Sequence, residues 1–353
     1  MPPTDTLIDA AGRWFLHSGI QEASGGVARY HRSDLGQNAR VSTEITGYAV
    51  STLLFLHQRT AGDPAYLDAA VRAARFLTGV AWDAKLGTFP FELPPAPAFA
   101  YFFDCGIIVR GLLCAWRATG EAEFRDTAIA AGRAMLADFQ AGQTFHPILA
   151  LPDKHPLAWE PRWSASPGCY QLKSAMAWRE LFEITGESEF QCGYETALRA
   201  ALQNDPEFLP GESDPQRVMD RLHAYAYFLE GLLPVLDRPE CALAFRDGVE
   251  RVSRLLREIA PDFVRSDVCA QLLRARMLGE AYGVLPLDET AAAHEAREAA
   301  SFQLPSGGFL FGRKQGEDMP FINPVSTAFC LQALALWNDR TAGRMAATRQ
   351  ELI

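Results

Sequence analysis

Two acidic residues, Glu44 and Asp104, each stand at the start of a long apolar segment. A pair of carboxyl groups can divide the work of acid–base chemistry, because one donates a proton while the other activates water or attacks. Apolar residues surround Asp104, among them Phe103 and Ile107. Such surroundings disfavour the ionised carboxylate and raise its pKa towards neutrality. We therefore expect Asp104 to act as a general acid or base, and Glu44 as the second carboxylate or a hydroxyl-binding group. The alternative is that both carboxyls are structural or only bind a ligand.

Other polar side chains gather at the start of the remaining apolar segments. His223 is a third candidate for acid–base chemistry or hydroxyl binding, and the alternative is a hydrogen-bonded core histidine. The further candidates for ligand binding at these positions are Tyr48, Tyr170, Gln171, Lys173, Asp220, Tyr227, Asp267, Gln271 and Asn323. Helix capping is the alternative for the acidic and amide groups. Capping does not require Tyr, His, Gln and Lys beside it, so the whole set favours a solvated binding cavity.

Aromatic and basic residues complete the candidate set. Trp82 and Trp163 lie in long connections and can stack on a flat apolar ring face, with packing inside the connection as the alternative. Arg276, like Lys173, can bind an anionic group on a ligand, with surface solvation as the alternative. The acidic run that contains Glu295 is interpreted as a solvated helix face.

Helical periodicity dominates the sequence. Six segments are apolar almost all round, which predicts helices buried on most sides: 45–57, 107–117, 172–184, 224–236, 268–282 and 325–337. More polar, amphipathic segments alternate with them: 5–17, 64–80, 121–140, 188–204, 239–259 and 288–302. The order is therefore outer helix, then inner helix, repeated six times.

Recurring turns indicate a repeat of helical hairpins. Gly62, Gly120 and Gly186 follow the first three inner segments, at intervals of roughly 60 residues, and glycine suits a left-handed helix cap. A helix pair cannot bury its apolar face alone, so neighbouring pairs must stack, and a closed ring leaves no exposed end. Four long connections, 18–43, 81–103, 141–168 and 303–323, would then lie over one face of the ring, where function usually resides.

This arrangement resembles the all-α (α/α)6 toroid, and we expect one such domain over residues 1–353. Two groups of proteins share that fold: six-hairpin glycosidases with related sugar enzymes, and the terpenoid cyclase/prenyltransferase group. The segments 43–48 (Thr-Glu-Ile-Thr-Gly-Tyr) and 103–106 (Phe-Asp-Cys-Gly) resemble inner-helix openings in bacterial sugar enzymes such as unsaturated glucuronyl hydrolases. The segments 24–30 and 303–309, both with a Gly-Gly pair, resemble the punctuation of cyclase and prenyltransferase repeats.

The resemblance implies a carbohydrate-active, glycoside hydrolase-like enzyme that acts on an oligosaccharide or a uronic-acid-containing sugar by carboxylate catalysis. The alternatives are a terpenoid cyclase/prenyltransferase relative and a non-catalytic toroid that binds a glycan or a protein. The pair Asp267-x-Cys269 has the zinc-ligand spacing of prenyltransferase-like toroids, but Ser326 stands where a third ligand, histidine, is required. No DxDD or DDxxD motif occurs. We therefore expect no metal and no cofactor.

Composition narrows the range of partners. The chain of 353 residues has a formal net charge of −10, which argues against nucleic-acid binding. Its start lacks the pattern of a signal peptide, and no run of about 18 apolar residues occurs. Seven scattered cysteines without a CxxC pair favour reduced thiols. We expect a cytoplasmic protein with a small-molecule or oligosaccharide ligand, and the sequence leaves its oligomeric state open.

Overall fold

The computed structural model describes residues 4–93, 98–209, 214–260, 262–344 and 352–353. Twelve α-helices make up most of this described part, with short strands in the connections. The chain forms two compact units, which we call unit 1 and unit 2. Unit 1 comprises Met1–Ile20, Tyr30–Ala39 and Glu207–Ile353, and unit 2 comprises Gln21–Arg29 and Arg40–Pro206.

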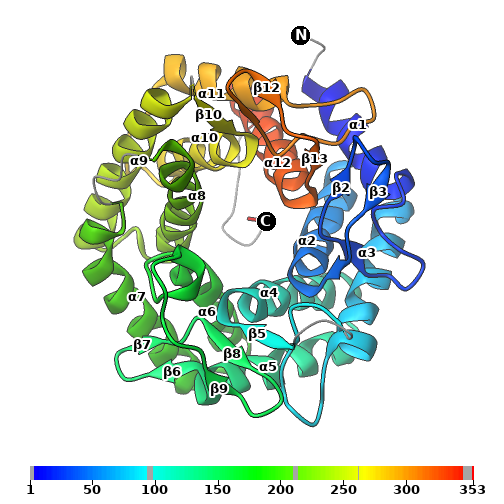
Figure 1. Ribbon diagram of the computed structural model, residues 1–353, viewed down its shortest axis with the longest axis vertical. Helices are drawn as coiled ribbons and strands as arrows, with labels where there is room; N and C mark the ends of the chain where they lie inside the picture. Colours follow the sequence, from blue (N-terminus) through cyan, green and yellow to red (C-terminus); the bar gives the residue numbers. More distant parts are fainter. Residues whose placement is uncertain (1–3, 94–97, 210–213, 261, 345–351) are drawn as a thin grey trace. The chain divides into compact units, whose positions relative to one another are not determined.

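Three buried helices form the inside of unit 2. They are α2 (Thr43–Arg59), α4 (Phe102–Thr119) and α6 (Gln171–Thr185). Helix α4 packs between α2 and α6, as Figure 1 shows. Each of the three is followed by a more exposed helix, namely α3 (Pro64–Phe76), α5 (Ala122–Phe139) and α7 (Ser188–Phe208). A π-helical turn, η1 (Leu77–Ala81), extends α3.

Small residues bring the buried helices of unit 2 unusually close together. A Cβ atom at Gly111 of α4 would lie 2.6 Å from the carbonyl oxygen of Gly47 on α2, and one at Gly106 would overlap Ser174 on α6. The Ser174 hydroxyl also donates to the carbonyl oxygen of Phe102, at 2.8 Å. These contacts lie within the first three turns of the helices, so they hold the starts of α2, α4 and α6 near one another.

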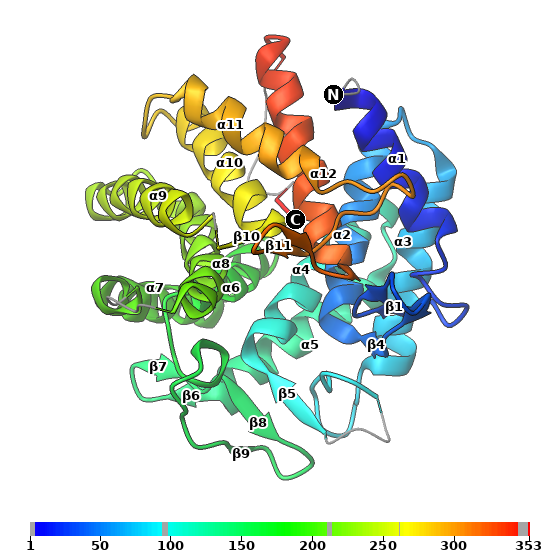
Figure 2. The ribbon, with the colours of Figure 1, turned by 45° about the horizontal axis from the view of Figure 1, so that its top comes forward.

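Unit 1 repeats the same alternation. Its buried helices are α8 (Pro215–Leu232), α10 (Ser266–Ala281) and α12 (Pro324–Thr341), and its more exposed ones are α1 (Thr4–His17), α9 (Pro239–Ile259) and α11 (Glu289–Ser301). Helix α10 packs against both α8 and α12. The first helix of the chain, α1, packs against the last, α12, and Figure 2 shows the two together.

Short antiparallel strands fill the long connections. In unit 2 they are β1 (Val27–Ala28) with β4 (Val41–Ser42), then β5 (Phe99–Tyr101), β8 (Ile148–Ala150) and β9 (His155–Pro156) in one sheet, and β6 (Gln140–Ala141) with β7 (Thr144–Phe145). In unit 1 they are β10 (Phe263–Arg265), β11 (Gly312–Lys314) and β12 (Glu317–Asp318) in one sheet, and β13 (Phe321–Ile322), β2 (His31–Arg32) and β3 (Gln37–Asn38) in another.

These strands determine where the buried helices begin. Strands β4, β5, β10 and β13 lead into α2, α4, α10 and α12 with at most one residue between. At the start of α4, the Phe102 amide donates to the carbonyl oxygen of Pro147, at 3.0 Å. At the start of α10, the Ser266 amide donates to the carbonyl oxygen of Phe311, at 3.0 Å. Side chains in the first turns are therefore held by both the strand and the helix.

The predicted alternation of helices is confirmed, with one clear error in α8. This helix begins at Pro215, whereas the apolar pattern predicts a start near residue 224. The polar segment before residue 224 masked the real start signal, which is Asp214 as N-cap followed by proline. Asp220 and His223 therefore lie inside the helix and not at its opening.

Two of the three glycines that were expected to cap helices do so. Gly120 and Gly186 cap α4 and α6 in the left-handed conformation, with φ of 75° and 73°. Residues 94–97 of the predicted connection 81–103 lie outside the described residues. The single domain over 1–353 remains a prediction. None of the helices in the described chain combines the length and apolar character needed to cross a bilayer.

Candidate functional site

Glu44 and Asp104 lie in the first turns of α2 and α4, and the charge of Glu44 acts on the pKa of Asp104. Asp104 is only 5% exposed, whereas part of Glu44 remains exposed. Two cations act on Glu44: Arg29, directly after β1, and Lys173, on the third residue of α6. Unit 2 thus gathers two predicted carboxyls and the predicted lysine in one cluster, which we call the carboxyl cluster.

Burial determines the protonation state of the two carboxyl groups. It raises the pKa of Asp104 well above its ordinary value, the charge of Glu44 adds to that rise, and Arg29 opposes it. Burial raises the pKa of Glu44 to about 7, against the opposing charges of Arg29 and Lys173. One oxygen of Asp104, Oδ2, has no hydrogen-bond partner within the described chain. Burial therefore favours the protonated form of Asp104, and Glu44 titrates at about pH 7.

Lys173 supplies a positive charge that the fold buries completely. Its side chain is 0% exposed, and its Nζ atom lies 5.5 Å from the ring centre of Tyr48. An ammonium group over an aromatic face is stabilised by the ring electrons. Tyr48 itself is 2% exposed and lies one turn after Glu44 on α2. The predicted residues of α2 and α6 therefore converge with those of α4.

The residues that open α6 have clear structural contacts. The Gln171 amide donates to the carbonyl oxygen of Phe145, at 3.1 Å, and its oxygen accepts from the Gly168 amide, at 3.2 Å. The Tyr170 hydroxyl donates to the carbonyl oxygen of Ser166, at 3.1 Å. Burial raises the pKa of the Tyr170 hydroxyl. Both residues thus fasten the preceding connection to α6.

The two candidate tryptophans differ in their surroundings. Trp163 meets Tyr170 edge-to-face, with ring centres 5.1 Å apart, and Tyr170 in turn lies 6.1 Å from the ring of Phe103. Trp163 therefore belongs to an aromatic group that reaches the residue next to Asp104. Trp82 packs on the fully buried Phe89, 4.9 Å away, inside its own connection. This contact favours the packing alternative for Trp82.

A second cluster, in unit 1, surrounds His223 on α8; we call it the histidine cluster. The Gln271 amide donates to the carbonyl oxygen of His223, at 3.4 Å, so the amide oxygen faces the imidazole. That oxygen lies 2.8 Å from Nδ1 of His223 and can only accept, which fixes the proton on Nδ1. The other nitrogen, Nε2, keeps its lone pair and bonds no group in the described chain.

Arg265 organises the charges of the histidine cluster. It donates to both oxygens of Asp267, at 3.0 and 2.7 Å, and to Asp220, at 2.8 Å. Burial alone would raise the pKa of Asp267, but Arg265 and His223 outweigh it and lower the pKa. Burial, with the charge of Arg265, lowers the pKa of His223 to about 4. The imidazole is therefore neutral at physiological pH.

Two arginines that act on these clusters, Arg265 and Arg29, were not among the residues expected from the sequence. Arg265 precedes α10 directly, and its ion pair with Asp267 joins residues only two positions apart. The signal in the sequence that could have identified Arg265 is its position two residues before Asp267, a candidate acid at a helix start. Arg29 offers no comparable signal, because it acts on the carboxyl cluster from the connection directly after the two-residue strand β1.

The remaining candidates in unit 1 separate into different roles. Tyr227 packs on His223, with ring centres 4.6 Å apart, and so belongs to the histidine cluster. Asn323 caps α12, its side-chain oxygen accepting from the Val325 amide at 2.8 Å. The capping alternative therefore accounts for Asn323.

Arg276 lies with neither cluster. It forms a buried ion pair with Glu295 of α11, at 2.9 Å, and donates to the hydroxyl of Ser253 on α9, at 2.6 Å. The interpretation of Glu295 as part of a solvated face is wrong, because this carboxylate faces α10 and is only 6% exposed. Arg276 fastens three helices together, which accounts for its side chain.

The side chains of Asp267 and Cys269, the pair with zinc-ligand spacing, face different parts of unit 1. Asp267 gives both oxygens to Arg265, whereas Cys269 lines a cavity of about 570 Å³ formed by α9, α10 and α11. Residues two apart on a helix face different directions. Among the described residues, no group of three or more His, Cys, Asp or Glu side chains is arranged to hold a metal ion.

Comparisons with known proteins identify the fold. No protein-family model matches the chain, and no curated protein matches it by sequence. Among solved structures, a cellobiose 2-epimerase from Spirochaeta thermophila matches with a TM-score of 0.71 at 15% identity, over 96% of this chain and 98% of that one.

Two other matches belong to different kinds of enzyme. A family 76 glycoside hydrolase from a Bacteroides thetaiotaomicron strain matches with a TM-score of 0.64 at 11% identity, over 95% of this chain and 78% of that one. A type II terpene cyclase from Scytonema matches with a TM-score of 0.60 at 15% identity, over 94% and 96%. The chain therefore has the all-α (α/α)6 toroid fold that its sequence predicts.

Proposed function

We propose that this protein is a carbohydrate-active enzyme in which Asp104 donates a proton and Glu44 is the partner carboxylate. One observation carries the proposal: two adjoining carboxyl groups with raised pKa values, Asp104 nearly fully buried and Glu44 titrating at about 7. A general acid must be protonated at working pH, and its partner must be able to ionise there. The raised pKa values of Asp104 and Glu44 support these two roles.

Hydrolysis of a glycosidic bond uses both groups. Asp104 gives its proton to the leaving oxygen as the bond between that oxygen and the anomeric carbon breaks. Ionised Glu44 takes a proton from water, whose oxygen bonds to the anomeric carbon. In the other route Glu44 itself bonds to that carbon, and water that gives its proton to Asp104 then displaces Glu44. The buried charge of Lys173 favours the ionised form of Glu44, which this role needs. The fold match to a family 76 glycoside hydrolase supports the same assignment.

A second candidate is epimerisation or isomerisation of a sugar. His223 is neutral, and Gln271 fixes its Nδ1 as a donor, so Nε2 can remove a proton next to a carbonyl group. The fold match to a cellobiose 2-epimerase supports this candidate. The terpene cyclase alternative has a fold match but no DxDD acid motif in the sequence.

A single assay separates the two reactions. Oligosaccharides and uronic-acid-containing sugars are incubated with the protein in D2O, and both new reducing ends and deuterium at C2 are measured. Hydrolysis releases reducing ends, whereas proton abstraction introduces deuterium. We expect Asp104→Asn to lower the release of reducing ends by about 10²–10⁴-fold, the contribution of a general acid, with the fold intact.

The matched control is Asp126→Asn, which changes an exposed aspartate on α5 and should leave turnover unchanged. Turnover per folded molecule that persists in Asp104→Asn contradicts the proposal and makes Asp104 a structural residue. Deuterium incorporation that is lost in His223→Gln but kept in Asp104→Asn establishes the second candidate in its place.

A further inference from the structure

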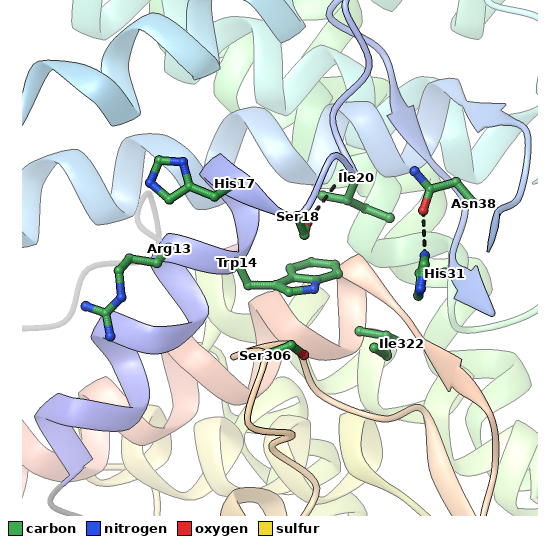
Figure 3. A pocket seen from close by; sticks show the side chains of 9 residues that line it. All are labelled: Arg13, Trp14, His17, Ser18, Ile20, His31, Asn38, Ser306 and Ile322. Atoms are coloured by element: carbon green, nitrogen blue, oxygen red, sulfur yellow. Dashed lines mark hydrogen bonds between the residues drawn. The ribbon is translucent and has the colours of Figure 1, made fainter. Parts of the chain in front are cut away.

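A separate recess lies in unit 1, where α1, the β2–β3 hairpin and the connection before α12 meet (Figure 3). Its volume is about 390 Å³. None of its lining residues belongs to the carboxyl cluster or to the histidine cluster. The recess therefore needs an explanation of its own.

The ionisable side chains around this recess are all basic. They are Arg13, His17 and His31, and no aspartate or glutamate lines it, although the whole chain carries a formal charge of −10. Within the described chain, the side chains of Arg13 and His17 form no ion pair and no hydrogen bond. Two exposed groups that can carry positive charge thus stand at one opening without an internal anion to neutralise them.

The hydrogen-bonding state of His31 is fixed by its neighbours. The Asn38 side-chain nitrogen donates to the carbonyl oxygen of Gly19, at 2.9 Å, which sets the orientation of the amide. Its oxygen then accepts from Nδ1 of His31, at 2.8 Å. Nε2 of His31 bonds no other group in the described chain, so it can accept from a hydroxyl or, when protonated, donate to an anion.

The floor of the recess is apolar and rigid. Trp14, Ile20 and Ile322 are 4%, 1% and 4% exposed. A Cβ atom at Gly308 would lie 2.8 Å from Nε1 of Trp14, so the backbone packs directly against the indole. Figure 3 shows this indole between Arg13 and the hairpin residue His31, with Ser306 beside it. The opening therefore combines a flat apolar floor with a polar rim.

We propose that this recess binds a monosaccharide-sized molecule that carries a phosphate or carboxylate group. Its volume is at the lower end of the range of small-molecule sites. Arg13 and His17 bind the anionic group, whereas His31 and Ser306 bind ring hydroxyls above the indole floor. The proposal rests on these residues alone and does not depend on the reaction assigned to Asp104.

Isothermal titration calorimetry with four probes tests the site. The probes are glucose 6-phosphate, glucuronate, glucose and inorganic phosphate, each at low and high KCl concentration. We expect the two charged sugars to bind more tightly than glucose or phosphate, and more weakly at high salt because Arg13 and His17 are exposed. Comparing glucose 6-phosphate with glucuronate shows which anionic group the site prefers.

Variants locate the binding. Arg13→Glu should weaken the binding of the charged sugars by at least about tenfold, the effect of losing one hydrogen bond to a charged group. Arg199→Glu, which alters an exposed arginine on α7, should leave it unchanged. Asp104→Asn should also retain binding, which separates this recess from the proposed active site. Circular dichroism verifies that each variant is folded.

The proposal would be overturned by any of the following results. They are no binding of either charged sugar at millimolar concentration, unchanged binding in Arg13→Glu, and binding of glucose as tight as that of glucose 6-phosphate. Inorganic phosphate that binds as tightly as glucose 6-phosphate would refute the assigned ring contacts. Loss of binding in Asp104→Asn would show that the charged sugar binds at the carboxyl cluster and not in this recess.

Discussion

Replacement of Glu44 by glutamine should change how the stability of this protein depends on pH. Glutamine keeps the size of the side chain but cannot ionise. Burial raises the pKa of Glu44 from 4.5 to about 7 in the folded chain. The wild-type protein therefore holds a proton at this position over a pH range in which the unfolded chain has released it.

The sign and size of the effect follow from that difference. Below pH 4.5, Glu44 is protonated in both states, and its contribution to the free energy of unfolding is fully present. Between pH 4.5 and about 7 the unfolded chain binds fewer protons, so the free energy of unfolding falls as the pH rises. The whole interval corresponds to a loss of about 3 kcal/mol. Above it, both states are ionised and the loss is complete.

Urea unfolding at several pH values between 4.5 and 8 measures this loss. The free energy of unfolding of Glu44→Gln, minus that of the wild type, should rise by about 3 kcal/mol across the range. Glu123→Gln, which changes an exposed carboxylate on α5, is the matched control and should show no such rise. A difference that stays constant with pH would show that Glu44 is ionised throughout, and the reasoning on the carboxyl cluster would fail.

Two further predictions concern the neighbours of the clusters. Gly111→Ala should destabilise the protein by about 1–3 kcal/mol in urea unfolding, because its Cβ would lie 2.6 Å from the carbonyl oxygen of Gly47. Gly79→Ala, with no atom within 4 Å, is the control, and equal effects of the two would contradict a close helix contact. Arg265→Gln should raise the pKa of His223 from about 4, because it removes a positive charge beside the imidazole. NMR titration of the ring measures this, and an unchanged or lower pKa would refute the assigned role of Arg265.

The helices were predictable because burial leaves a strong periodic trace in the sequence. Buried helices such as α10 and α12 present apolar residues on every side, whereas α9 is apolar along one stripe. The short strands were missed for the opposite reason. Segments of two or three residues, such as β10, are too short to show alternation, and their pairing partner lies far away in the sequence.

The candidate sites were predictable where the residues themselves begin a helix. Glu44 and Asp104 were found because first turns of stacked helices point to a common end, and Lys173 followed from the same rule. His223 was selected because it was expected at the start of a helix, but it lies within α8. Arg265 and Arg29 could not be assigned, because their contacts depend on the positions of short strands.

Capping and binding could not be separated from the sequence alone. Asn323 and Asp267 both stand at the start of a helix and have similar chemistry. In the structure, Asn323 accepts hydrogen bonds from the backbone of α12, whereas Asp267 pairs with an arginine. The difference arises because β10, the strand that leads into α10, carries the arginine that pairs with Asp267.

The packing of α1 against α12 has a consequence for biosynthesis. Helix α1 leaves the ribosome well before its partners in unit 1, which include α12 and Gln303, whose side chain donates to the carbonyl oxygen of Leu7. Strand β2 likewise cannot form its pairing with β13 until residues 321–322 have been made. Residues 40–206 of unit 2 can assemble while the chain is still growing. Until α12 has been made, the apolar side of α1 therefore lacks its native cover, and a chaperone that shields nascent chains can bind it.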